Sequence, residues 1–270
     1  MTEWAVILVL GVIEGITEFL PVSSTGHLLL AQYLAERQGW VVQQSDLFNT
    51  VIQCGAVLAV GALFTQRVRQ LVVDWRGPAS RRYLSRLAVA FVLTSAGAVL
   101  LKGVGLTLPE TAGPVAWATL IGGVVIFGVE RAVRKKPGQA EISWTAAVVV
   151  GLFQLVAAAF PGTSRSGATI LAAMAVGVSR PAATEFSFLL GIPTLLCAGA
   201  FQIVGAWYDA HRQAVPMGED WVRLIVASIV AAVTAFLVVR WLLRFVQTHT
   251  FLVFGWYRIA LGLAILGLQD

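Results

Sequence analysis

Long, almost uncharged apolar stretches recur along this 270-residue chain and constrain its fold more than any other feature. Only 12% of the residues are charged, about half the ~25% of soluble domains, whereas 58% are hydrophobic. A chain with so little charged surface is excluded as a soluble enzyme, a disordered protein or a secreted disulfide scaffold. The composition therefore predicts an all-α polytopic membrane protein.

Six of the stretches approach the ~20 residues that a helix needs to cross a bilayer. We expect these spanning helices at about 48–66, 87–104, 114–131, 185–207, 221–240 and 251–268. Two further regions, 4–36 and 142–180, each hold two apolar stretches separated by a polar segment. Lipid cannot satisfy bare backbone groups, so we predict two re-entrant helical hairpins whose tips are enclosed by protein. The N-terminus lacks the basic region and cleavage site of a signal peptide, so we expect no cleaved leader.

The basic residues are distributed unevenly between the two sides of this arrangement. If each hairpin returns to the side from which it enters, thirteen cations face one side and four face the other. The thirteen are Arg67, Arg69, Arg76, Arg81, Arg82, Arg86, Arg131, Arg134, Lys135, Lys136, Arg180, Arg240 and Arg244, and the four are Arg37, Lys102, Arg212 and Arg223. The positive-inside rule then places the richer side in the cytoplasm and both termini outside. The net charge of +5 follows from this bias and does not indicate nucleic-acid binding.

The two hairpins would have opposite senses, and a weak repeat recurs at an offset of 140 residues. The matching pairs are Gly11 and Gly151, Glu14 and Gln154, Pro21 and Pro161, Ser24 and Ser164, Phe48 and Phe188, and Ile52 and Ile192. Glycine and proline could recur by chance, but the opposite senses favour an inverted-topology repeat. We predict one integral-membrane domain over 1–270, with repeats at about 1–130 and 141–270.

The break in the first hairpin concentrates groups that are costly inside a membrane. Glu14 and Glu18 are four residues apart and share a helix face, where a divalent cation or a shared proton would relieve their repulsion. The segment Pro21-Val-Ser-Ser-Thr-Gly-His27 then supplies hydroxyl groups and an imidazole, that is, a nucleophile and a proton handler. The alternatives are glutamates paired with arginines of another helix and a simple helix cap.

The break in the second hairpin contains a guanidinium among hydroxyl groups and small residues, Pro161-Gly-Thr-Ser-Arg-Ser-Gly-Ala-Thr169. Arg165 offers forked donors, and the helix that follows directs its positive end toward an anion. A snorkelling arginine is the alternative, but the flanking residues are apolar. If the two tips converge, acids, hydroxyls and a cation surround one phosphate group, which is the set that phosphoryl transfer requires.

These two segments resemble the signature motifs of the bacterial undecaprenyl-diphosphate phosphatases, the bacitracin-resistance family. The resemblance continues through Glu185-Phe-Ser-Phe-Leu-Leu and Trp256-Tyr-Arg-Ile-Ala-Leu-Gly and covers essentially the whole chain. It implies hydrolysis of undecaprenyl diphosphate to undecaprenyl phosphate and inorganic phosphate, which recycles the cell-wall carrier lipid for which bacitracin competes. It also implies six transmembrane helices with two re-entrant hairpins in inverted repeat.

The resemblance further implies a divalent cation, Mg²⁺ or Ca²⁺, and a place in the bacterial cytoplasmic (inner) membrane with the active site toward the outer side. By motif position, Glu14 and Glu18 would be metal or acid–base carboxylates. Ser24 would be the nucleophile and His27 its proton partner, although His27 or a metal-held water could attack instead. Arg165 would clamp the diphosphate. The substrate-binding residues would be Ser23, Thr25, Ser164, Ser166 and Thr169.

Two other functions compete with this one as explanations of the sequence. A polyprenyl-phosphate lipid flippase or transporter that uses the same pocket is the alternative, because inverted repeats with midplane sites suit alternating access. A phosphatase of the phosphatidic-acid type would need a Lys-x6-Arg-Pro element that this sequence lacks. We expect an ion pair or a helix cap for Glu185 and a carboxylate partner inside the bundle for Arg258. A homodimer is left open, and no nucleic-acid partner is expected.

Overall fold

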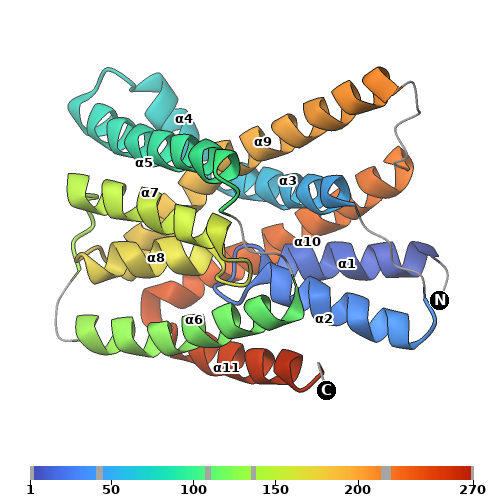
Figure 1. Ribbon diagram of the computed structural model, residues 1–270. Coiled ribbons are helices and arrows are strands. Elements are labelled where there is room, and N and C mark those ends of the chain that lie inside the picture. The colour runs from blue at the N-terminus through green and yellow to red at the C-terminus, as the bar shows by residue number, and fades with distance from the viewer. Residues whose placement is uncertain (1–2, 41–44, 107–110, 135–137, 214–219, 269–270) are drawn as a thin grey trace.

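The computed structural model describes residues 3–40, 45–106, 111–134, 138–213 and 220–268, which are almost entirely helical (Figure 1). The helices are α1 (Glu3–Thr17), α2 (Ser24–Arg37), α3 (Asp46–Leu63), α4 (Thr65–Val73), α5 (Pro78–Gly103), α6 (Ala112–Val133), α7 (Trp144–Ala159), α8 (Arg165–Ala175), α9 (Arg180–Gln213), α10 (Trp221–Thr248) and α11 (Leu252–Leu266). The described residues form no strand, and one isolated β-bridge joins Gln139 to Val178. The all-α prediction is confirmed.

Several of these helices have the length and composition of membrane spans. Among the described residues α5, α6, α9 and α10 are long and apolar enough to cross a bilayer, and α3 with α4, bent by 70°, can make a fifth span. Large apolar side chains such as Val99, Val124 and Leu237 are exposed on their outer faces, as lipid contact requires. The chain therefore has the helices of a multi-pass membrane protein. The sixth predicted span is the 15-residue α11, which is shorter than expected.

Both regions predicted as hairpins are pairs of short helices joined at a tip. The α1–α2 pair breaks between Thr17 and Ser24, and the α7–α8 pair breaks between Ala159 and Arg165. Helix α8 has 11 residues, about 16 Å of helix, and is buried from Ser166 to Met174. Figure 1 shows the two pairs approaching from opposite ends of the bundle, with their tips close together near its centre.

The same backbone device starts the second helix of each pair. Ser23 (φ 74°) and Ser164 (φ 68°) are the two non-glycine residues with positive φ in the described chain. Each side chain caps its helix, accepting a hydrogen bond from the backbone N–H of Gly26 or Gly167. Ser164 is therefore the counterpart of Ser23, and the predicted match of Ser24 with Ser164 is wrong by one residue.

One additional residue in the second tip causes this shift. Gly162 has φ 94°, and a Cβ there would collide with the Val115 carbonyl oxygen, so only glycine fits. Past this insertion, Arg165 stands where the first tip has Ser24. The two tips thus place different chemistry at equivalent first positions of a helix.

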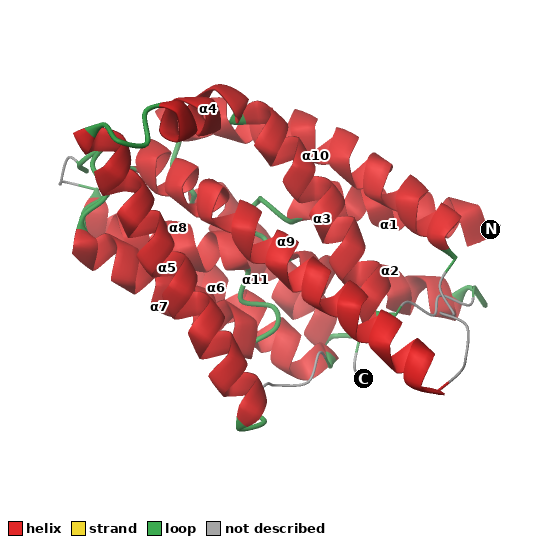
Figure 2. Ribbon diagram, turned by 90° about the horizontal axis from the view of Figure 1, so that it is seen from above, coloured by secondary structure: helices red, strands yellow, loops and turns green. Residues whose placement is uncertain are grey.

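The helices pack in pairs that relate the two halves of the chain. Helix α1 packs on α10, its counterpart α7 packs on α5, and α6 and α3 pack on α11 and α9 respectively. Figure 2 shows α9 running between the α5–α7 pair and the group formed by α1, α3 and α10. The tips are thereby enclosed by long helices on several sides.

The cation-rich connections gather at one end of the bundle. Helix α4, the start of α5, the end of α6 and the start of α9 lie toward the left of Figure 1. Two ion pairs link them, Arg67 with Glu185 and Arg180 with Glu130. Lys135 and Lys136, counted among the thirteen cations, lie outside the described residues.

Candidate active site

The two tips are in direct contact. The Ser166 hydroxyl of the second tip donates a hydrogen bond of 2.9 Å to the Leu20 carbonyl oxygen of the first. Arg165 Nη2 donates to Glu18 Oε1 at 3.3 Å, and both side chains are largely buried. The structure therefore brings the acidic tip and the guanidinium tip together.

Glu18 interacts with two of the predicted site residues. Its Oε1 accepts from Arg165, and its Oε2 accepts a 2.9 Å hydrogen bond from the Ser24 hydroxyl. Ser24 and Arg165 are the first residues of α2 and α8, so both partners of this carboxylate stand at the N-terminus of a helix. An anion entering here would meet a hydroxyl, a guanidinium and two helix N-termini.

Glu14 is fully buried, and neither of its carboxylate oxygens has a hydrogen-bond partner in the part of the chain that the structure describes. It lies one helical turn before Glu18 and interacts electrostatically with Glu18 and Arg165. A buried, unpartnered carboxylate beside a second one is a suitable pair of oxygen ligands for a divalent cation. The described residues contain no group of three or more His, Cys, Asp or Glu side chains that could hold a metal. Mg²⁺ commonly binds one or two carboxylates and completes its ligands with water and substrate phosphate, so this pair fits that use.

The Arg165 guanidinium is held in a narrow space. It lies over the Phe19 ring, with Cζ 5.5 Å from the ring centroid. On its other side it touches α9 at Gly191, where any Cβ would collide with Nη1. Its buried Nε and Nη1 form no hydrogen bond with any of the described residues. The group is thus fixed in place with donors still available for phosphate oxygens.

His27 does not form a hydrogen bond with Ser24, the partner predicted for it. Its Nδ1 lies 2.7 Å from the Ser23 carbonyl oxygen, and its Nε2 lies 2.7 Å from the Tyr257 hydroxyl. A carbonyl only accepts, so Nδ1 carries a hydrogen, and when the ring is neutral Nε2 accepts from the Tyr257 hydroxyl. The two rings are also stacked, with 8° between their planes. The hydrogen-bond partner of the Ser24 hydroxyl in this structure is Glu18.

Tyr257 is a residue that sequence reasoning missed. It belongs to the Trp256-Tyr-Arg segment of α11, more than two hundred residues from His27, and no spacing rule connects the two. The signal that could have found it was its inclusion in a segment that resembles the family outside both signature motifs.

The remaining hydroxyl groups play different parts. Ser23 and Ser164 cap their helices, and Ser166 bonds to Leu20 of the opposite tip. Thr169 is fully buried, and its hydroxyl lies 2.5 Å from that of Ser187. These four residues stabilise the tips from within. The Thr25 hydroxyl, on the second residue of α2, forms no hydrogen bond with any described residue.

Arg258 forms no ion pair with a carboxylate of the described residues, and within them the carboxylate partner predicted for it is absent. The side chain is 1% exposed and donates hydrogen bonds to main-chain carbonyl oxygens instead. The carbonyl oxygens belong to α6 and to both tips. Helix breaks leave such oxygens without helical partners, and a buried guanidinium satisfies several at once.

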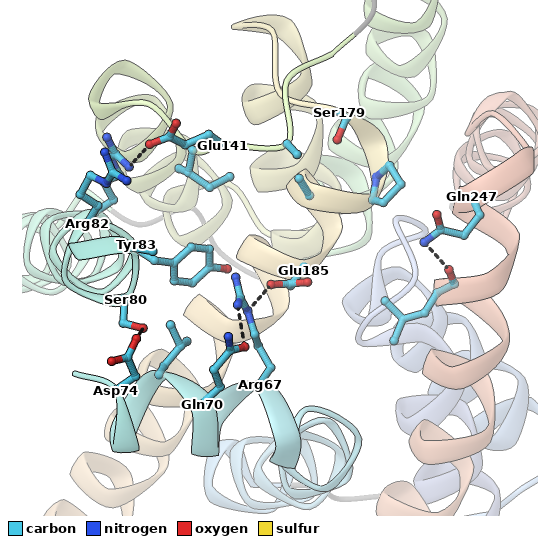
Figure 3. Close-up of a pocket in the computed structure, with 18 residues that line it drawn as sticks. Arg67, Gln70, Asp74, Ser80, Arg82, Tyr83, Glu141, Ser179, Glu185 and Gln247 are labelled. Carbon is cyan, nitrogen blue, oxygen red and sulfur yellow. Dashed lines mark hydrogen bonds and ion pairs between the residues drawn. The ribbon is translucent and has the colours of Figure 1, made fainter. Parts of the chain in front are cut away.

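A separate cavity of about 520 Å³ lies at the cation-rich end, lined by α4, α5, α9 and α10 (Figure 3). Two of its three arginines are already paired: Arg67 with Glu185 at 2.8 Å and Arg86 with Glu141 at 3.0 Å. None of the predicted site residues lines it. The ion pair expected for Glu185 is confirmed, and this cavity is distinct from the tips.

Comparison with known proteins identifies close relatives. Residues 7–264 match the family described as bacitracin resistance protein BacA. The chain is 47% identical over 261 residues to the undecaprenyl-diphosphatase of Rhizobium johnstonii, which covers 96% of this chain and 95% of that protein. It is 44% identical to the undecaprenyl-diphosphatase of Xylella fastidiosa over 98% of both chains. The corresponding protein of Xanthomonas euvesicatoria is 42% identical over 98% of this chain and 97% of its own. These names give no support to the flippase alternative.

Proposed function

Because this chain belongs to the bacitracin resistance protein BacA family, we propose that it hydrolyses undecaprenyl diphosphate to undecaprenyl phosphate and inorganic phosphate. The observation that carries the proposal is the contact between the tips: Glu18 accepts hydrogen bonds from both Ser24 and Arg165. The Glu18 carboxylate, as proton acceptor, therefore contacts both the nucleophile Ser24 and the phosphate-binding cation Arg165.

In the proposed reaction, Ser24 Oγ attacks the terminal phosphorus. A bond forms between this oxygen and phosphorus, the bond from phosphorus to the bridging oxygen breaks, and undecaprenyl phosphate leaves. Glu18 Oε2 accepts the Ser24 proton, since the two already share a 2.9 Å hydrogen bond. Water then attacks the phosphoserine, releasing inorganic phosphate and restoring the hydroxyl. Arg165 stabilises the charge that develops on the phosphoryl oxygens.

Glu14 and Glu18 would hold a divalent cation, Mg²⁺ or Ca²⁺, as the two unpartnered oxygens of Glu14 favour. When bound, the cation would neutralise charge on the diphosphate. His27 is the alternative nucleophile. Acid treatment of enzyme labelled with substrate distinguishes the two, because phosphoserine survives acid and phosphohistidine does not.

The membrane arrangement is part of the proposal. Six spans (α3 with α4, α5, α6, α9, α10 and α11) surround two re-entrant hairpins in an inverted repeat over one domain. The opposite approach of the hairpins in Figure 1 and the matched Ser23 and Ser164 support it. The cation-rich end would face the cytoplasm of a bacterial inner membrane, with the site reached from the outer side. Bacitracin would compete for the substrate, and a homodimer stays a prediction.

Phosphate release from undecaprenyl diphosphate by the purified protein tests the activity. Glu18→Gln, Ser24→Ala and Arg165→Ala should each lose about 100-fold or more of kcat. Ser228→Ala is the matched control, because it removes a hydroxyl that bonds to the Val51 carbonyl oxygen away from the tips. Hydrolysis that persists in all three site variants would refute the assignment. A reporter tag in the 67–86 connection found outside the cell would refute the topology.

A further inference from the structure

Arg258 donates hydrogen bonds to the backbone of both tips and of α6. Nε donates to α6, Nη1 donates to both tips, and Nη2 donates to α6 and the second tip. The acceptor oxygens and distances are Thr119 (3.0 Å), Pro21 (3.3 Å), Thr163 (3.0 Å), Ala118 (3.1 Å) and Gly162 (3.1 Å). One rigid group therefore joins three separate segments of the backbone.

These hydrogen bonds satisfy the backbone carbonyl oxygens and also fix the distances between the segments that carry them. The guanidinium is planar and presents its donors in a fixed fork, so the oxygens that it binds are held at a set spacing. Pro21 lies three residues after Glu18, and Thr163 lies two residues before Arg165. The spacing that Arg258 sets between Pro21 and Thr163 is thus passed on to the Glu18–Arg165 pair.

We propose that Arg258 is a positioning residue for the active site, which sets the geometry between Glu18 and Arg165 without touching the substrate. The inference rests on the proposed phosphatase function and extends it to α11. The guanidinium forms no ion pair with a described carboxylate, so its charge also adds to the positive field behind the tips.

Helix α6 provides an independent way to disturb Arg258 without replacing it. Gly122 lies against the guanidinium, and a Cβ there would collide with Nη2 and Cζ. Gly128, on the same helix, has no atom within 4 Å of the place its Cβ would take. Gly122→Ala and Gly128→Ala are therefore a matched pair of identical substitutions, of which only one displaces Arg258.

The experiment measures kcat and KM for undecaprenyl diphosphate in Arg258→Lys, Gly122→Ala and Gly128→Ala. Lysine keeps the charge but lacks the fork, so kcat should fall about 100-fold, as misplacement by about 1 Å commonly causes. Gly122→Ala should lower kcat in the same direction, and Gly128→Ala should leave it unchanged. Size-exclusion profiles and helix content confirm that each variant is folded. If Arg258→Lys does not fold, the glycine pair decides the question.

Double substitutions separate positioning from a general structural role. If Arg258 acts by placing Arg165, then Arg258→Lys should add little once Arg165→Lys is present. Glu141→Gln, which breaks the ion pair with Arg86 at the cation-rich end and touches neither the tips nor α11, serves as the control. Its effect and that of Arg165→Lys should multiply within about twofold, as those of independent sites do. Folded Arg258→Lys and Gly122→Ala with wild-type kcat, or fully multiplicative Arg258 and Arg165 effects, would overturn the inference. Wild-type protein that releases no phosphate would instead refute the proposed function.

Discussion

Arg165 Nη2 lies 3.3 Å from Glu18 Oε1, and this ion pair joins two hairpins that are about 140 residues apart in sequence. The Arg165 and Glu18 side chains are 13% and 6% exposed. Buried charges interact strongly with little screening. The site thus holds its cation in place before substrate arrives, while Nε and Nη1 stay free to donate.

Arg165→Lys should lower kcat about 100-fold, because a point charge does not reproduce the paired donors of a planar fork. The assay is phosphate release at saturating substrate. Arg180→Lys makes the same exchange in an ion pair at the cation-rich end and should leave kcat near the wild-type value. Near-normal turnover of Arg165→Lys would contradict clamping by two donors.

Gly191→Ala should impair the enzyme although glycine has no side chain that could take part in the reaction. The added methyl group would collide with Arg165 Nη1 and displace the guanidinium from Phe19. We expect a fall in kcat of about tenfold or more, since small misplacements of a clamp are costly. Gly205→Ala is the control on the same helix, because no atom lies within 4 Å of its Cβ position. Equal kcat values for the two variants would show that Arg165 tolerates the shift.

The sequence predicted features that depend on local composition. Apolar length located the long helices, and the polar breaks located both tips, because each rests on a rule that applies within about twenty residues. Glu14 and Glu18 share a helix face for the same reason. The opposite senses of the hairpins followed from the count of basic residues on each side, whereas the contact between the tips was only a condition of the predicted site.

Other features depend on three-dimensional contacts that no spacing reveals. The partners of Arg258 are backbone oxygens, which every residue carries, so the sequence offered a charge and no visible acceptor. His27 took Tyr257 as its partner because α11 packs beside α2, and the nearby Ser24 bonds to Glu18 instead. The repeat was misaligned by one residue because the second tip has one more residue between its proline and its cap serine, and the shared positive φ of Ser23 and Ser164 is what identifies the caps as equivalent.

Tyr257→Phe should lower kcat by about tenfold while preserving the ring stacked on His27. The substitution removes only the hydroxyl that donates to His27 Nε2, so the ring loses the partner that fixes its orientation. Tyr208→Phe, an exposed tyrosine on α9, is the matched control. In combination with His27→Ala, Tyr257→Phe should have no further effect. An additional loss in that double variant would mean that Tyr257 acts independently of His27.

Glu14→Gln should weaken binding of the divalent cation while keeping the shape of the side chain. A bound ligand raises the unfolding temperature by an amount that grows with the ratio of its concentration to its Kd, so Mg²⁺ and Ca²⁺ titrations followed by thermal unfolding measure this without an activity assay. The concentration of metal needed for half of the wild-type shift should rise by at least about tenfold. Glu141→Gln, which changes an exposed carboxylate paired with Arg86 at the cation-rich end, should not alter it. If Glu14→Gln and wild type respond identically to both metals, Glu14 is not a ligand and its two unpartnered oxygens need another explanation, such as a shared proton with Glu18.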